Sequence, residues 1–301
     1  MIPPRIFRSF HTNIILRAAN KLLLSKLRKK TGYTFINCKK ALELHNDDFE
    51  KAEQWLKDEA QKQGWEQATK LKSRLTTQGL VALRVNNNHG VLVEINCETD
   101  FVARNKKFHD LTETIVNALM QHGKTIEAKE KINKTILYTD AMQALPAADG
   151  KCLADHSALT IGAIGENINL RRALCMSVHP SIKLFGCTHP SPINPVPVSF
   201  GKYGALVALK CKGNDNNLGT QLCQHVIGMN PVRIGDPNVD EPHTESDNET
   251  LMLFQEFLFD PAISVQQLLI NEQATLIDFT RFEMGEVLAE DKELNSVETC
   301  G

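Results

Sequence analysis

The sequence predicts an α+β fold, in which an N-terminal module of three helices precedes a core of two related α+β subdomains with antiparallel sheets. Apolar residues recur at helical spacing within residues 22–63 and alternate at strand spacing after Gly79. The run Leu-Val-Ala-Leu-Arg at residues 80–84 is almost repeated as Leu-Val-Ala-Leu-Lys at residues 206–210, and a helical pattern follows each run. A chain of 301 residues is long enough to bury the cores of two or three domains.

The N-terminal module is predicted to comprise residues 22–63. A leucine stripe marks a first helix that ends near Gly32, and apolar spacing marks a second helix over residues 36–44. Asp47 and Glu50 have the spacing of a capping box, which predicts the start of a third helix that buries Leu56. Residues 64–78 are polar and are predicted to form a linker helix before the core. A module this small is better suited to binding than to catalysis.

The core is predicted to divide into subdomains of residues 79–165 and 166–301. The first is expected to contain strands 79–85 and 91–97 around a turn, then a helix that buries Phe108 and Leu111, and a partly helical stretch over residues 123–160. The second is expected to contain a hairpin of strands 168–178 and 182–189, a strand at 205–211, a helix near 265–270 and a strand near 276–283. Prolines predict an irregular loop over residues 190–203, and acidic residues predict a solvated linker over residues 236–250.

The first residues of the chain are basic. Residues 1–42 contain no Asp or Glu, while eight Arg and Lys residues fall within the first thirty. An Arg-rich, hydroxylated and acid-free leader is typical of a mitochondrial transit peptide, which predicts removal of residues 1–21 and a location in the mitochondrial matrix. A basic arm that binds nucleic acid is the alternative. No apolar run reaches the 18 residues that a membrane span would need.

The chemistry-bearing residues form no known catalytic or metal-binding pattern. The eight cysteines include no C-x-x-C pair, so no zinc site is predicted, and a reducing compartment fits their dispersed placement. Gly123-Lys124-Thr125 ends like a phosphate-binding loop, but Ala118 stands where that motif requires Gly. We therefore expect no enzyme activity, no cofactor and no small-molecule substrate, although a thiol enzyme remains an alternative. The formal net charge of −2 argues against a general polyanion binder.

The segment Thr99-Asp100-Phe101-Val102 lies at the turn between the strand 91–97 and the helix after it. A turn tip is a place where side chains can project into a partner. The plainer interpretation is a helix start, with Thr99 or Asp100 as the N-cap and Phe101 folded back as a local apolar anchor. Spacing alone favours this plainer interpretation, whereas the sequence around the segment favours a tip that projects into a partner.

Four stretches in order resemble the elongation factor Ts family, the nucleotide exchange factors of elongation factor Tu. They are residues 26–42, which resemble the family's UBA-like N-terminal module, Glu94–Ala103, Ile164–Arg172, and Arg281–Glu286. The resemblance they carry extends from about residue 22 to residue 286, which is nearly all of the chain after the leader. The chain lacks the long coiled-coil excursion of bacterial members and has a longer Pro-rich loop, so it is more similar to mitochondrial members. Val287 departs from the Gly that is common there.

The resemblance implies a partner and a site. The expected partner is the G domain of mitochondrial elongation factor Tu, with no direct contact to nucleic acid or membrane. Asp100 and Phe101 would enter the G domain beside its magnesium site, and the stretch Ile164–Arg172 would fix the core fold. The full set of implied partner-binding residues is Thr99, Asp100, Phe101, Val102, Arg28, Phe35, Ile36, Asn37 and His189. The alternative is an RNA- or ribosome-associated protein that uses the basic N-terminal helix.

Overall fold

The computed structural model describes residues 21–31, 33–126, 131–211 and 216–288, which form two compact units of residues 1–63 and 64–301. Residues 1–20 of the predicted transit peptide lie outside the described residues, as does Gly32 with its predicted role at a helix end.

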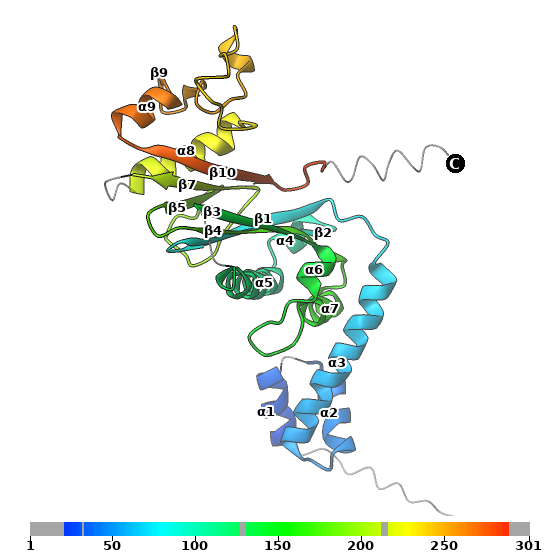
Figure 1. Cartoon of the computed structure of the whole chain (residues 1–301). Helices are drawn as coiled ribbons and strands as arrows, with labels where there is room; N and C mark the ends of the chain where they lie inside the picture. The colour runs from blue at the N-terminus through cyan, green and yellow to red at the C-terminus, as the bar shows by residue number, and fades with distance from the viewer. Residues whose placement is uncertain (1–20, 32, 127–130, 212–215, 289–301) are drawn as a thin grey trace, which may run out of the picture. The chain divides into compact units, whose positions relative to one another are not determined.

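The first unit is built from helices α1 (Lys21–Thr31), α2 (Phe35–Leu44) and the first part of α3 (Phe49–Leu71) (Figure 1). Its small core consists of Leu24, Leu27, Cys38, Ala41, Leu42, Ala52 and Leu56, so the expected three-helix module is confirmed. The cap of α3 lies one residue later than expected, because Asp48 Oδ1 accepts the Lys51 N–H at 3.1 Å. Asn46 and Asp47 before it both have positive φ, which places the chain reversal there.

The predicted linker helix is not a separate element. Helix α3 continues without a break from Phe49 to Leu71, so the third helix of the module and the start of the predicted linker belong to one helix. An irregular segment then leads into β1 (Gln78–Asn86).

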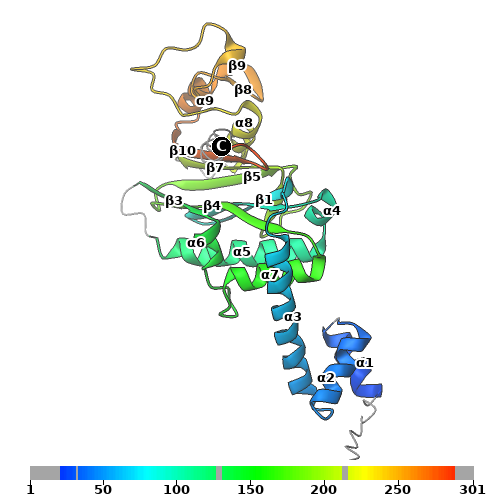
Figure 2. The ribbon, with the colours of Figure 1, turned by 90° about the vertical axis from the view of Figure 1, so that its right-hand side faces the viewer.

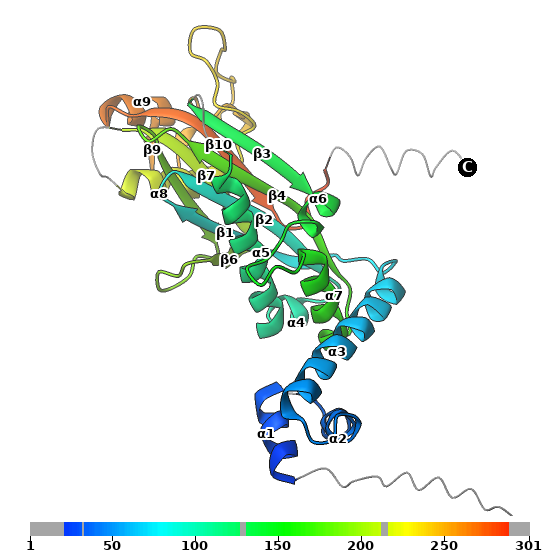
Figure 3. The same ribbon diagram turned by 60° about the horizontal axis from the view of Figure 1, so that its bottom comes forward.

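The second unit contains two antiparallel sheets. Among the described residues, the larger sheet has the order β3-β4-β2-β1-β6, from β1, β2 (His89–Cys97), β3 (Ile132–Tyr138), β4 (Ile168–Val178) and β6 (Ser199–Gly201). One face of this sheet is covered by α4 (Asp100–Ala103), α5 (Lys106–Lys124), α6 (Thr139–Gln143) and α7 (Leu153–Ile164) (Figure 3). The α+β class is therefore confirmed.

The smaller sheet has the order β10-β7-β5, from β5 (Lys183–His189), β7 (Tyr203–Lys210) and β10 (Thr275–Glu283). Helix α8 (Asn216–Met229) packs on its outer face, followed by the one-turn η1 (Ser246–Asn248), β8 (Glu256–Phe257), β9 (Asp260–Ser264) and α9 (Val265–Asn271). Figure 2 shows the resulting layers, from α8 through the two sheets to α5 and α7.

Both sheets are buried on both faces. In β1, Leu80 and Ala82 face the helices while Val81 and Leu83 pack against the smaller sheet. In β7 the order is reversed, since Leu206 and Ala208 pack between the sheets. The matching residues of the two Leu-Val-Ala-Leu runs thus face opposite directions relative to their helices. A continuous apolar run is what a strand covered on both sides requires.

Glycines allow the two sheets to approach closely. A Cβ on Gly90 would lie 2.6 Å from a methyl group of Leu184, and one on Gly204 would lie 2.6 Å from a methyl group of Leu92. A Cβ on Gly186 would meet both methyl groups of Leu83 at 2.9 Å. Since real Cβ atoms do not approach carbon this closely, leucines of each sheet occupy the space left by glycines of the other.

Two expectations for the strands were wrong, and one strand was not expected. The stretch 123–160 is helical in part, as predicted, in α6 and α7, but it also contains the strand β3. Strand β4 pairs with β2 and β3 in the larger sheet, whereas β5 pairs with β7 in the smaller one, so 168–178 and 182–189 do not form a hairpin. The Pro-rich segment contributes the short strand β6, which pairs with β1.

Candidate partner-binding site

The tip predicted from the sequence is the single helical turn α4, at the end of β2. Thr99 is its N-cap, and its hydroxyl oxygen accepts the Val102 N–H at 3.4 Å. The Phe101 side chain is 81% exposed, whereas Val102 is buried in the core between the larger sheet and its helices. Phe101 therefore does not fold back as a local anchor, and the tip presents an unpacked aromatic ring to solvent.

The helix expected to start at the tip is divided in two. Helix α4 ends at Ala103, and α5 begins at Lys106 with Asn105 as its own N-cap, whose Oδ1 accepts the Lys107 N–H at 2.9 Å. Asp100 has a half-exposed side chain that pairs with Arg104 at 3.1 Å. Because this ion pair is exposed, it holds the carboxylate only weakly.

The tip is anchored to the loop between α7 and β4 by two carboxylates. Glu166 Oε2 accepts the Thr99 N–H at 3.1 Å, and Glu166 Oε1 accepts the Thr99 hydroxyl proton at 2.8 Å. In return, Glu98 Oε1 accepts the Asn167 N–H at 2.7 Å. Residues from two of the four signature stretches thus hold each other, and we call this set of contacts the reciprocal clasp.

A second polar network joins three of the signature stretches, and it connects β2 and β4 of the larger sheet with the segment that follows β10 of the smaller sheet. The fully buried Glu94 accepts hydrogen bonds from Arg171 Nη1 at 2.9 Å, Arg172 Nε at 2.8 Å and the Gly285 N–H at 2.7 Å. A bulge in β4 shifts the register opposite Glu94, which allows two consecutive arginines to reach one carboxylate. Arg172 also pairs with Glu286 at 2.9 Å. The stretch from Ile164 to Arg172 therefore supports the core, as expected.

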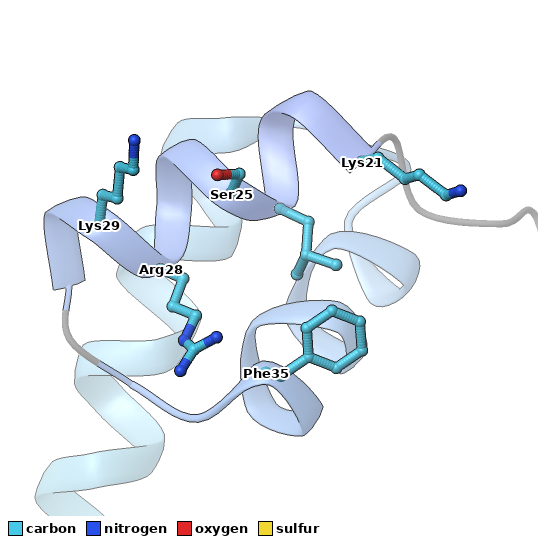
Figure 4. Close-up of a pocket in the computed structure, with 6 residues that line it drawn as sticks. Lys21, Ser25, Arg28, Lys29 and Phe35 are labelled. Carbon is cyan, nitrogen blue, oxygen red and sulfur yellow. The ribbon is translucent and has the colours of Figure 1, made fainter.

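In the first unit, two of the predicted residues lie together at a hollow of about 630 Å³. Arg28 and Phe35 line it with Lys21, Leu24, Ser25 and Lys29, and Figure 4 shows the Arg28 and Phe35 side chains on neighbouring helices. Ile36 is exposed next to it, but neither Ile36 nor Asn37 lines the hollow. The Asn37 backbone N–H caps α2 by donating to Thr34 Oγ1 at 3.3 Å. The hollow combines an apolar floor with a basic rim.

His189 lies at the exposed end of β5, where its ring centroid is 6.3 Å from that of Tyr203. It borders a second hollow of about 400 Å³. Leu258 and Phe259 also line this second hollow, and both are partly exposed. Sequence reasoning missed both, because nothing in their spacing connects residues 258–259 with a strand that ends at 189.

Two buried cysteines of the larger sheet, one of them next to the tip, are poor nucleophiles. Burial raises the pKa of the Cys97 thiol to about 12, and the nearby Glu166 carboxylate acts in the same direction. Burial alone raises the pKa of Cys175 to about 12. In the part of the chain that the structure describes, no three His, Cys, Asp or Glu side chains gather as metal ligands. The described helices include none with the length and apolarity of a membrane span.

Comparisons with known proteins agree on one family. The family model "Elongation factor Ts, mitochondrial, N-terminal" matches residues 7–66, and the model "Elongation factor TS" matches residues 98–251. The chain is 47% identical over 280 residues to the mitochondrial elongation factor Ts of Aedes aegypti, covering 91% of each chain. It is 42% identical over 277 residues to that of Homo sapiens, covering 89% of this chain and 84% of the human one.

Proposed function

This chain belongs to the elongation factor Ts family, and from that premise we propose that it is a guanine nucleotide exchange factor for elongation factor Tu in the mitochondrial matrix. The observation that carries the proposal is the exposed Phe101 ring on an anchored helical turn, beside the half-exposed carboxylate of Asp100. A large apolar ring held in water at the tip of an anchored turn is available for burial in a partner. No covalent chemistry is involved.

The proposed mechanism is a wedge. Phe101 enters an apolar pocket of the G domain, and burial of a Phe side chain contributes roughly 1.5–3 kcal/mol. Asp100 disturbs the water shell of the magnesium ion that holds the β-phosphate of GDP. A thousandfold faster release of GDP requires a barrier lower by about 4 kcal/mol, which these two effects together can supply.

Val102 and Thr99 hold the turn that carries Asp100 and Phe101. Val102 is buried in the core, and Thr99 is hydrogen-bonded to Glu166. Additional contacts hold the complex together while nucleotide exchanges. They come from the hollow at Arg28 and Phe35, with neighbouring Ile36 and Asn37, and from the end of β5 at His189. Coupling is reciprocal, so the factor weakens nucleotide binding as much as nucleotide weakens the factor. Incoming GTP therefore releases it.

The RNA-binding alternative has less support. Lys26 and Lys30, two of the basic residues of α1, lie over the Phe49 ring at 5.2 Å and 5.4 Å, and Lys30 also pairs with Glu53. This part of the basic charge is engaged within the module itself. An RNA-binding role predicts an affinity for RNA that falls steeply with salt and does not depend on Phe101.

The experiment measures release of a fluorescent GDP analogue from mitochondrial elongation factor Tu with catalytic amounts of the chain. We expect strong acceleration that Phe101→Ala abolishes while the circular dichroism spectrum is unchanged. The matched control is Val239→Ala, since Val239 is 79% exposed but lies in the acidic segment. A folded chain that binds elongation factor Tu without accelerating release would refute the exchange role, and absence of binding would refute the partner as well.

A further inference from the structure

We propose that Glu166 is a positioning residue for nucleotide exchange, because it fixes the direction in which α4 presents Phe101. The hydrogen bonds that the structure gives its carboxylate go to Thr99, so it acts on Phe101 through that residue. This inference rests on the proposed function and extends it to a residue outside the expected contact set. It requires the clasp to hold a turn that is not stable by itself.

Helix α4 needs such support because of its length. It spans four residues, and a single helical turn has no independent stability, since the first turn fixes several backbone dihedral angles for one hydrogen bond. Its side-chain cap is the Thr99 hydroxyl, which accepts the Val102 N–H. A hydroxyl group has one proton and can rotate, so the cap works only when that proton points elsewhere.

Glu166 determines where the proton points. Oε1 of Glu166 takes the Thr99 hydroxyl proton at 2.8 Å, which leaves a lone pair of the oxygen free to face Val102 N–H. Oε2 holds the Thr99 backbone N–H at 3.1 Å and thereby fixes the residue from which the turn starts. Within the described residues, both hydrogen bonds that the structure gives this carboxylate go to Thr99. Bonds to an ionised acceptor are the stronger kind.

The loop that carries Glu166 is itself held. Gly165 ends α7 with φ +86°, in the left-handed region that favours glycine, and this turns the next residue toward the tip. Asn167 then donates its N–H to Glu98 and its side-chain amide to the Arg74 carbonyl at 2.9 Å. Because the two segments hold each other from both directions, the end of α7 sets the orientation of α4.

The test compares Glu166→Ala and Glu166→Gln with the wild-type chain in the GDP-release assay, as a function of factor concentration. We expect the maximal rate with Glu166→Ala to fall about tenfold, while the concentration for half-maximal effect changes less than about threefold, since Phe101 and the other contact surfaces remain. Glu166→Gln retains one acceptor for the Thr99 N–H and should recover part of the rate. Glu249→Gln is the matched control, because Glu249 also accepts backbone N–H groups, from His243 and Leu251, but lies in the acidic segment.

Hydrogen exchange of the amides of residues 99–105 gives a second readout that does not depend on elongation factor Tu. We expect faster exchange there in Glu166→Ala, with unchanged exchange in β4 and α5. Wild-type rates with wild-type protection would overturn the proposal, and so would a change in half-maximal concentration alone. If Glu166→Ala fails to fold, Glu166→Gln and Thr99→Val still test the proposal, because both weaken the same contacts. Each should then lower the maximal rate of GDP release and speed up amide exchange at residues 99–105. If the wild-type chain does not accelerate release, the proposed function fails, and exchange at residues 99–105 still decides whether Glu166 orders the tip.

Discussion

Replacement of Glu94 by Gln should lower the stability of the core more than any change at a surface ion pair. Glu94 is fully buried and accepts hydrogen bonds from Arg171, Arg172 and the Gly285 N–H at 2.7–2.9 Å. Gln is uncharged and cannot neutralise the buried guanidinium groups. Its NH₂ group is a donor, and it would replace an oxygen that accepts hydrogen bonds from the surrounding N–H groups. Breaking a buried ion pair by removing one partner costs about 3–5 kcal/mol.

The assay is thermal unfolding of the full chain, followed by circular dichroism. For a unit of this size each kcal/mol lowers Tm by about 2–4 °C, so we expect a decrease of roughly 6–20 °C. Asp240→Asn is the control, because Asp240 pairs with Arg233 at 2.5 Å, a shorter distance than any at Glu94, but Arg233 is exposed. The shorter distance alone would predict the larger loss of stability for Asp240→Asn, whereas burial predicts the larger loss for Glu94→Gln. A Tm for Glu94→Gln no lower than that of Asp240→Asn would refute the argument from burial.

The remaining predictions concern thiols and pH. In the folded chain at pH 8, iodoacetamide should leave Cys97 and Cys175 unmodified, because burial raises the pKa of each to about 12. Cys187 should react before them, since a hydrogen bond from the Cys223 thiol lowers its pKa; peptide mass spectrometry gives the order, and early modification of Cys97 would contradict it. Burial also lowers the pKa of His225, so the unfolded state takes up a proton more readily, and the contribution of the neutral ring to stability is lost as pH falls below about 6.5. Urea midpoints at pH 7.5 and 5.5 should therefore differ more for the wild-type chain than for His225→Gln, and equal differences would exclude His225 as the cause.

Local patterns predicted the elements with strong periodicity. The strand 91–97 and the helix that buries Phe108 follow from apolar spacing, and both are present as β2 and α5. Strand β3 was missed because it is an edge strand, with exposed Lys134 and Ile136 among its residues, and lacks a clear apolar face. The pairing of β4 and β5 was misjudged because adjacent strands form hairpins more often than they cross between sheets.

The sequence could locate the tip but not its exposure. A capping Thr99 and an aromatic residue two positions later fit a ring that folds back equally well, and the difference depends on what surrounds the turn. That surrounding comes from Glu166, which is 67 residues away in the sequence. Similarly, nothing in the spacing of Glu94 shows that Arg171 and Arg172 reach it, because the β4 bulge places both arginines near one carboxylate.

The glycines between the sheets have a mechanical consequence. Leucine methyl groups of one sheet occupy the positions that the glycines of the other leave open, at Gly90, Gly186 and Gly204. If one sheet slid over the other, these methyl groups would clash with the backbone. The layer between the sheets is therefore expected to resist shear. The two sheets are therefore expected to move as one body, so that the turn α4 at the end of β2 keeps its position relative to the smaller sheet.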